Sequence, residues 1–314
     1  MSIFFDSLLL LFLFAVLGVA ADFVVKNIKY VASVLKIKLF AFGILLGLIT
    51  TLPELSVGIN VTIKGVAALS VGNLLSGIIV IFGLILGASL LLNRQIFTDG
   101  KLSVLIPEVA VIFSPILFGL DGSYGLLDGL AMTGLYFGLI FYLYRANHTF
   151  GLSLSHSEMI NKNKIAKAIL LSIIGIVFIL LASHWIVKIT LDLLNYINIS
   201  KFVIGALVFA VGTNLPEITI AIASWRKKTS ELSLSHLLSS AFTNVLVLGI
   251  LAVIRPIVFG IDSAFWILAI FLSLTMFSFL IFYYSDRKMD RREGLILLSI
   301  YILFLIVNFW LLRS

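Results

Sequence analysis

The sequence predicts an all-α polytopic membrane protein in which ten transmembrane helices form two inverted repeats of five. Three observations lead to this prediction. Hydrophobic residues make up 61% of the 314 residues and charged residues only 12%, against about 25% charged in soluble domains. Apolar stretches of about 20 residues, the length that crosses the hydrocarbon core of a bilayer, recur along the chain. A pentapeptide that carries a carboxylate also occurs twice inside these stretches.

Charges, glycines and prolines delimit the apolar stretches and so place the predicted helices. The ten helices are predicted at residues 5–27, 39–63, 67–92, 103–119, 124–145, 166–190, 202–225, 232–254, 264–284 and 293–312. The first stretch has no basic segment before it and no convincing cleavage signature after it. We therefore expect it to be a retained span and not a signal peptide. The longest polar stretch, from Arg145 to Lys164, is interpreted as a solvated linker.

The basic residues give the predicted orientation. Most of the 22 Lys and Arg residues lie in or beside the loops that follow the first, third, fifth, seventh and ninth helices. The positive-inside rule places these loops in the cytoplasm and both termini outside. The net charge of +7 therefore follows mostly from topology and requires no nucleic-acid partner. The predicted domains are a first five-helix repeat at 1–145, a cytoplasmic linker at 146–163 and a second, inverted repeat at 164–314. We expect an integral protein of the cell membrane, and a monomer is compatible with the sequence.

The duplicated pentapeptide relates the two halves of the chain. Residues 50–54 read TTLPE and residues 213–217 read TNLPE, and an offset of 163 positions relates them. The same offset relates Lys38 to Lys201 and residues 74–76 to 237–239 without a gap. Because each half holds an odd number of spans, the second and seventh helices cross the membrane in opposite directions. Inverted repeats with interrupted helices at matching positions are typical of secondary transporters.

Each copy of the pentapeptide combines a helix break with a charge. Proline has no N–H to donate to the helix, so carbonyl groups near Ile49 and Thr50, and near Gly212 and Thr213, lose partners. Glu54 and Glu217 follow the two prolines directly. Two carboxylates together with carbonyl and hydroxyl oxygens suit a hard cation such as Ca²⁺, which takes six to eight oxygen ligands. The chain has no cysteine, and no histidine cluster lies near the motif, which disfavours a transition metal.

The repulsion between two buried carboxylates also favours a site that exchanges one cation for another. At a separation of about 6 Å and an effective dielectric constant near 20 they repel each other by roughly 3 kcal/mol. An empty site should therefore take up a proton or monovalent cations. The alternative is a pair of structural proline kinks in which each Glu is hydrogen-bonded to the backbone; two symmetric copies disfavour it.

These features resemble the sodium/calcium exchanger group of the calcium:cation antiporter superfamily. The resemblance rests on the Thr-x-Leu-Pro-Glu elements, the five-plus-five repeat and residues 292–295 (REGL) at the start of the last helix, with Asp128-Gly129 as a weaker counterpart in the fifth. It implies that Glu54 and Glu217 bind Ca²⁺ and that the carbonyls of Thr50 and Thr213 complete the shell. It also implies that the first and sixth helices slide against the other eight.

The chain departs from the family pattern beside the site. The family usually carries Gly-Asn-x-x-Gly-Ser-Asn-x-x-(Asn or Asp) on the helix after each motif. The serine position is Gly77 in the first repeat and Ser240 in the second, and the last polar position is Ile81 and Asn244. The central site is therefore predicted to be intact, with reduced monovalent sites on the first-repeat side. The predicted cation ligands are Glu54, Glu217, Thr50, Thr213, Thr51, Asn214, Ser240, Asn244 and Asn73.

Other polar residues are given structural roles. Asn73 and His236 are equivalent, and we expect hydrogen bonds to the broken helices from both in preference to direct ligation. Asp22 and His184 are interpreted as polar groups satisfied near helix ends, and Glu108 as a loop charge.

The sequence thus predicts a secondary active antiporter that exchanges Ca²⁺ for Na⁺ by alternating access, with a Ca²⁺/H⁺ antiporter as the alternative. A hypothesis of another class is a non-transporting cation sensor or scaffold derived from an exchanger. No nucleophile–base arrangement is visible, so an enzyme is not expected. We expect no cofactor, and inorganic cations and the lipid bilayer as partners.

Overall fold

The computed structural model describes residues 3–34, 39–93, 95–98, 100–146, 162–194, 200–226, 230–285 and 288–311. Within these residues, nine helices are long and apolar enough to cross a membrane. The predicted second span is the remaining crossing, and it is divided into two helices of 12 residues each, α2 (Leu39–Thr50) and α3 (Leu52–Ile63). The predicted all-helical polytopic fold is confirmed. The predicted linker lies almost wholly outside the described residues, so the domain boundaries stay predictions.

The elements follow one another as the apolar stretches predict. In the first half, α1 (Ile3–Val34), α2 and α3 are followed by α4 (Ala68–Ile79), η1 (Val80–Leu86), α5 (Gly87–Asn93), β1 (Gln95–Phe97), α6 (Leu102–Phe118), η2 (Gly119–Asp121), β2 (Ser123–Tyr124) and α7 (Leu126–Arg145). The second half contains α8 (Lys162–Leu194), α9 (Lys201–Ile204), η3 (Gly205–Phe209), α10 (Ala210–Thr213), α11 (Leu215–Arg226), α12 (Ser230–Ile254), β3 (Ile257–Val258), α13 (Ser263–Tyr284), β4 (Lys288–Asp290) and α14 (Arg291–Leu311).

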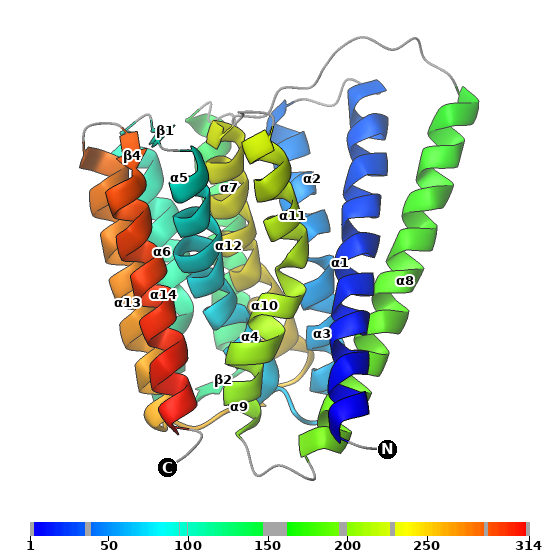
Figure 1. Cartoon of the computed structure of the whole chain (residues 1–314), viewed down its shortest axis with the longest axis vertical. Helices are drawn as coiled ribbons and strands as arrows, with labels where there is room; N and C mark the ends of the chain where they lie inside the picture. Colours follow the sequence, from blue (N-terminus) through cyan, green and yellow to red (C-terminus); the bar gives the residue numbers. More distant parts are fainter. Residues whose placement is uncertain are drawn as a thin grey trace.

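The helices of the two halves surround a buried centre. In the most apolar part of Ala68–Asn93 and of His236–Ile254, 83% of the residues are buried inside the protein. In α7 and α14 the buried share is only 28%. The third and eighth spans therefore lie at the centre, and the outer helices present apolar side chains to lipid. The start of α1 and the end of α14 lie at the same end of the bundle (Figure 1).

Helices α1 and α8 form a pair at one edge of the bundle (Figure 1). Their apolar side chains form a cluster with residues of the broken helices such as Ile49 and Val57, and Leu17 and Ala21 of α1 and Ile186 and Val187 of α8 are fully buried in it. The other spans share a second, larger cluster. The α1–α8 pair thus packs against the broken helices through the smaller of the two clusters.

Two short sheets display the inverted symmetry. β1 pairs with β4 in antiparallel register, Gln95 opposite Asp290, and β2 pairs with β3, Ser123 opposite Val258. β1 and β3 follow the third and eighth spans, and β2 and β4 precede the fifth and tenth. Each sheet therefore joins one half of the chain to the other. These strands were not predicted from the sequence, because they are two or three residues long and form by pairing between distant loops.

Close helix crossings repeat with the same symmetry. A Cβ on Gly87 would lie 3.0 Å from the carbonyl oxygen of Gly294, and one on Gly129 would lie 2.7 Å from that of Gly249. Gly87 and Gly249 occupy the third and eighth spans, and Gly129 and Gly294 the fifth and tenth. Small residues at such crossings let helix backbones approach closely in a membrane.

Candidate functional site

The two copies of the pentapeptide form the same local structure. Thr51, between α2 and α3, has φ −90° and ψ 9°, and Asn214, between α10 and α11, has φ −83° and ψ 12°. Each break is a single residue wide, and a proline occupies the first turn of the helix that follows. Proline fits that position because the first-turn N–H groups have no partner within the helix. The break predicted from the sequence is thus present in both halves.

The breaks place two carboxylates at helix N-termini inside the protein. Glu54 lies in the first turn of α3 and Glu217 in the first turn of α11, where backbone N–H groups and the helix dipole favour a negative charge. Both side chains are 1% exposed, and the two carboxylates interact electrostatically. Within the described residues, the Oε2 atom of each has no hydrogen-bond partner. A buried charge with an unpaired oxygen is unfavourable unless a cation compensates it.

Contacts from each half reach the carboxylate of the other. The Ser240 hydroxyl donates to Glu217 Oε1 at 3.2 Å, and it lies 3.3 Å from the hydroxyl of Thr50. The Thr50 side chain also contacts Glu217, and the Thr213 side chain contacts Glu54. These hydroxyl oxygens and the two carboxylates therefore converge from both repeats. The structure brings together Thr50, Glu54, Thr213, Glu217 and Ser240, and their role as cation ligands stays a prediction.

Asn73 connects the third span to the second broken helix. Its Oδ1 accepts a hydrogen bond of 3.1 Å from the Thr213 hydroxyl, and Asn73 is 1% exposed. This is the hydrogen-bonding role expected for Asn73, whereas its role as a ligand stays a prediction. His236, its equivalent, is also buried, with 4% of its surface exposed.

The residues at the two breaks cap the helix that precedes them. The Thr51 hydroxyl donates to the Gly47 carbonyl at 3.1 Å, and Asn214 Nδ2 donates to the Ala210 carbonyl at 2.7 Å. In each case the acceptor lies four residues earlier. Any ligation of a cation by Asn214 would therefore use its Oδ1, because Nδ2 is a donor.

The first-repeat flank of the site is filled by amide groups. A Cβ on Gly77 would lie 3.1 Å from Asn214 Nδ2 and 3.3 Å from Asn244 Nδ2. Asn244 Nδ2 also lies 3.4 Å from the Leu74 carbonyl oxygen. The missing side chain at position 77 thus makes room for two NH₂ groups. The π-helix η1 starts at Val80, one residue before Ile81, so the backbone differs here as well.

Two buried serines beside the site were not predicted from the sequence. Ser76 and Ser239 are equivalent under the repeat offset, are 0% and 3% exposed, and have hydroxyls without a partner within the described residues. Ser239 faces α2 at Gly47, where a Cβ would clash with its hydroxyl. The sequence could have indicated both serines, because they occupy the same position of the Leu-Leu-Ser segment that occurs in each repeat.

The prediction that Glu108 is a loop charge is wrong. Glu108 lies within α6 and is only 2% exposed. The proline directly before it resembles a loop signal, but α6 continues through Pro107 and packs this face against other helices.

The acidic residues at the start of the fifth and tenth spans have a capping role. Asp128 Oδ2 accepts from the Gly125 N–H at 2.8 Å, and Glu293 Oε2 accepts from the Asp290 N–H at 2.8 Å. In both helices the carboxylate belongs to the residue three positions after the one whose backbone N–H it accepts from, which is the arrangement of a capping box. The weaker counterpart noted in the sequence, Asp128-Gly129, thus matches Glu293-Gly294 in structure.

Comparison with known proteins identifies similar chains over the full length. A family model described as sodium/calcium exchanger protein matches residues 6–145 and 167–310. The sodium/calcium exchanger MaX1 of Methanosarcina acetivorans is 24% identical, over 98% of this chain and 99% of that protein. The inner membrane protein YrbG of Escherichia coli is 24% identical, over 83% of each chain.

Two kinds of solved structure share the fold. A crystal structure of the H⁺/Ca²⁺ exchanger CAX matches with a TM-score of 0.79 and 14% identity, over 98% of this chain and 85% of that chain. The sodium-calcium exchanger NCX_Mj, soaked with 2.5 mM Na⁺ and 0.1 mM Ca²⁺, matches with a TM-score of 0.67 and 21% identity, over 98% and 99% of the two chains. At these identities the likeness concerns the fold.

Proposed function

Because the chain belongs to the sodium/calcium exchanger protein family, we propose that it exchanges Ca²⁺ for Na⁺ across the cell membrane by alternating access. Family membership supports the coarser assignment, a Ca²⁺/cation antiporter of the membrane. The choice of Na⁺, the membrane and the transport cycle are our proposal. The transported ions are substrates, and the proposal needs no cofactor.

The observation that carries this proposal is the pair of buried carboxylates with unpaired oxygens. Glu54 and Glu217 would neutralise one divalent ion, and Thr50 and Thr213 would add carbonyl or hydroxyl oxygens. When Ca²⁺ leaves, the two charges repel each other and favour the entry of monovalent cations. Loss of one ion thereby promotes uptake of the other, which is the requirement for exchange.

The packing of α1 and α8 supports the proposed motion. The apolar cluster that these helices form with the broken helices is separate from the larger cluster of the other spans. The apolar part of this contact can shift without breaking hydrogen bonds, whereas the hydrogen bonds of Ser183 on α8 with Ser56 and Asn60 on α3 would have to break as the pair slides. Such a movement would open the site to one face of the membrane at a time.

The test is uptake of radiolabelled Ca²⁺ into proteoliposomes under an imposed gradient of Na⁺ or of H⁺. We expect an outward Na⁺ gradient to drive uptake, and dissipation of that gradient to stop it. Uptake driven by pH alone would replace Na⁺ by H⁺ as the counter-ion. Ca²⁺ binding without flux under either gradient would support the sensor or scaffold hypothesis and contradict an antiporter.

A specific observation favours H⁺ coupling as the second candidate. The Asn214 and Asn244 amide groups face Gly77, where the family carries a serine hydroxyl. An NH₂ group repels a cation, so fewer Na⁺ ions would bind on this flank, or protons would replace them.

The contribution of Asn244, the second-repeat counterpart of Ile81, can be measured with Asn244→Ala. We expect the Na⁺ or H⁺ dependence of Ca²⁺ flux to weaken by about 10–100-fold, since a lost contact to a charged group corresponds to about 1.5–3 kcal/mol. The matched control is Ile81→Val at the equivalent position, which removes one methyl group from a buried site and should leave coupling unchanged. Equal sensitivity at the two positions would contradict the proposed asymmetry.

The predicted orientation can be tested with single cysteines, because the chain has none of its own. Lys288 and Ser263 are both exposed, near opposite ends of α13. We expect Lys288→Cys to react with a membrane-impermeant thiol reagent only from the cytoplasm, and Ser263→Cys only from outside. The reverse pattern would invert the orientation of the whole protein.

A further inference from the structure

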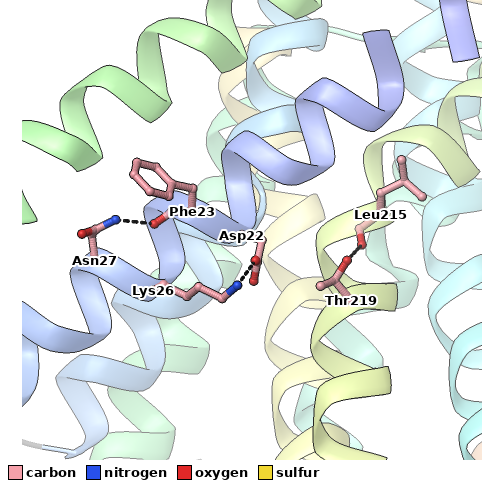
Figure 2. A network of polar contacts seen from close by, with 6 residues as sticks. All are labelled: Asp22, Phe23, Lys26, Asn27, Leu215 and Thr219. Atoms are coloured by element: carbon pink, nitrogen blue, oxygen red, sulfur yellow. Dashed lines mark hydrogen bonds and ion pairs between the residues drawn. The ribbon is translucent and has the colours of Figure 1, made fainter. Parts of the chain in front are cut away.

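Near the second broken helix, α1 presents an acidic and a basic side chain toward α11. The two helices run in the same direction (Figure 1), and they touch where a Cβ on Gly18 would lie 2.8 Å from the Leu215 Cβ. Four residues advance either helix by about 6 Å, so Asp22 lies at the level of Thr219. Figure 2 shows Asp22 and Lys26 on the part of α1 that lies beside the Thr219 segment of α11.

Asp22 and Lys26 form an ion pair within an apolar span. The pair lies in the stretch Phe5–Ile28, and the side chains are 19% and 71% exposed. Ionisable residues inside transmembrane segments face the bundle interior or a water-filled passage. Thr219 is exposed and donates to the Leu215 carbonyl at 2.9 Å, so its hydroxyl oxygen keeps acceptor capacity.

The equivalent contact in the other half of the bundle is closed. Ser56 of α3 is the counterpart of Thr219, and its hydroxyl contacts that of Ser183 of α8. Asn60 Nδ2 also donates to Ser183 at 3.1 Å, and both serines are buried. The contact between α3 and α8 is therefore held by hydrogen bonds, whereas the one between α1 and α11 exposes Thr219 and part of Asp22.

The exposed contact lies close to the candidate site. Thr219 follows Glu217 by two residues, a rise of about 3 Å along α11, although its side chain lies about 200° around the helix from that of Glu217. A cation that moves from Glu217 toward the Arg226 end of α11 therefore passes the level of Asp22 within the first turn.

From this geometry we propose that Asp22, with Thr219, is a transit site for cations between Glu217 and the membrane face at which α11 ends, and that Lys26 is its resident counter-charge. The proposal rests on the proposed transport function. A carboxylate and a hydroxyl are suitable ligands for a hard cation. Lys26 neutralises Asp22 when no ion is in transit, and its exposed, flexible side chain moves away when an ion arrives.

The first test measures Ca²⁺ flux with Ca²⁺ presented at the face where α11 ends. Asp22→Asn leaves Lys26 unpaired in the path, and we expect kcat/KM for Ca²⁺ from that face to fall by about tenfold, as for loss of electrostatic steering. Lys26→Gln should raise it, and the double variant should return close to the unmodified value. The matched control Asp192→Asn removes an exposed carboxylate from α8 and should change nothing. If kcat/KM for Ca²⁺ falls in Asp22→Asn, in Lys26→Gln and in the double variant alike, the pair has a structural role and the proposal is overturned.

The second test does not depend on transport. Thr219→Cys in this cysteine-free chain should react with an impermeant thiol reagent from the face where α11 ends, and Ca²⁺ should slow the reaction. In the Asp22→Asn background we expect no protection by Ca²⁺. Ser56→Cys, at the closed contact, should stay unreactive.

The two tests separate the two proposals. If the unmodified protein moves no Ca²⁺, the proposed function fails, and the labelling result still decides whether Asp22 binds the cation. An unreactive Thr219→Cys, or equal protection without Asp22, would overturn the transit site even if transport is normal.

Discussion

Glu54→Gln and Glu217→Gln should each abolish Ca²⁺ exchange while the protein still inserts and folds. Each substitution removes one of the two charges that would neutralise Ca²⁺. At 4 Å and an effective dielectric constant of 20, one unit charge contributes about 4 kcal/mol, or about three orders of magnitude in affinity. The measurement is Ca²⁺ flux in proteoliposomes, together with the shift of thermal unfolding temperature that Ca²⁺ produces.

Stability should separate loss of binding from loss of fold. Glutamine keeps the shape of the side chain and removes the repulsion between the two carboxylates. We therefore expect each variant without Ca²⁺ to be at least as stable as the unmodified protein, and Ca²⁺ to stabilise it no further. Asp128→Asn is the control, because Asp128 caps α7 and should affect transport little. Near-normal exchange by either Gln variant would show that the divalent site lies elsewhere.

Gly72→Ala and Gly205→Ala should each prevent stable folding. A Cβ on Gly72 would lie 2.1 Å from the Phe202 carbonyl oxygen, and one on Gly205 would lie 2.1 Å from that of Leu69. Both obstacles are backbone atoms, which cannot rotate away as a side chain can. The crossing of α4 with α9 and η3 would have to widen, and overpacking of this kind costs about 1–3 kcal/mol or more. We expect little monodisperse protein in detergent and a markedly lower unfolding temperature.

Two glycines of α7 provide the control for these substitutions. Gly134 and Gly138 are exposed, and a Cβ on either would have nothing within 4 Å among the described residues. Gly134→Ala and Gly138→Ala should leave the yield and the unfolding temperature unchanged or slightly raised, since alanine is the better helix former. Normal stability of Gly72→Ala would mean that the crossing is looser than the structure indicates.

The duplicated motif shows how much of the site a linear pattern can predict. Proline has no N–H, so a broken helix follows from its presence in an apolar stretch, and both breaks occur where the sequence predicts them. The carboxylates directly after the prolines are buried for the same reason, because the surrounding residues are apolar. Glu108 also follows a proline, yet α6 is not broken there. The proline rule therefore identified the site only because the motif is repeated.

The sequence by itself determined the membrane fold, the inverted repeat, the two breaks and the carboxylates, because hydropathy, proline geometry and repetition are properties of the chain. Tertiary structure alone decided which groups meet across the repeats. The Ser240–Thr50 and Thr213–Asn73 contacts, the two amides at Gly77, the β1–β4 pairing and the position of Asp22 beside Thr219 join segments about 100 or more residues apart, or helices whose register no local pattern specifies. Such contacts depend on how helices rotate and cross, which packing determines.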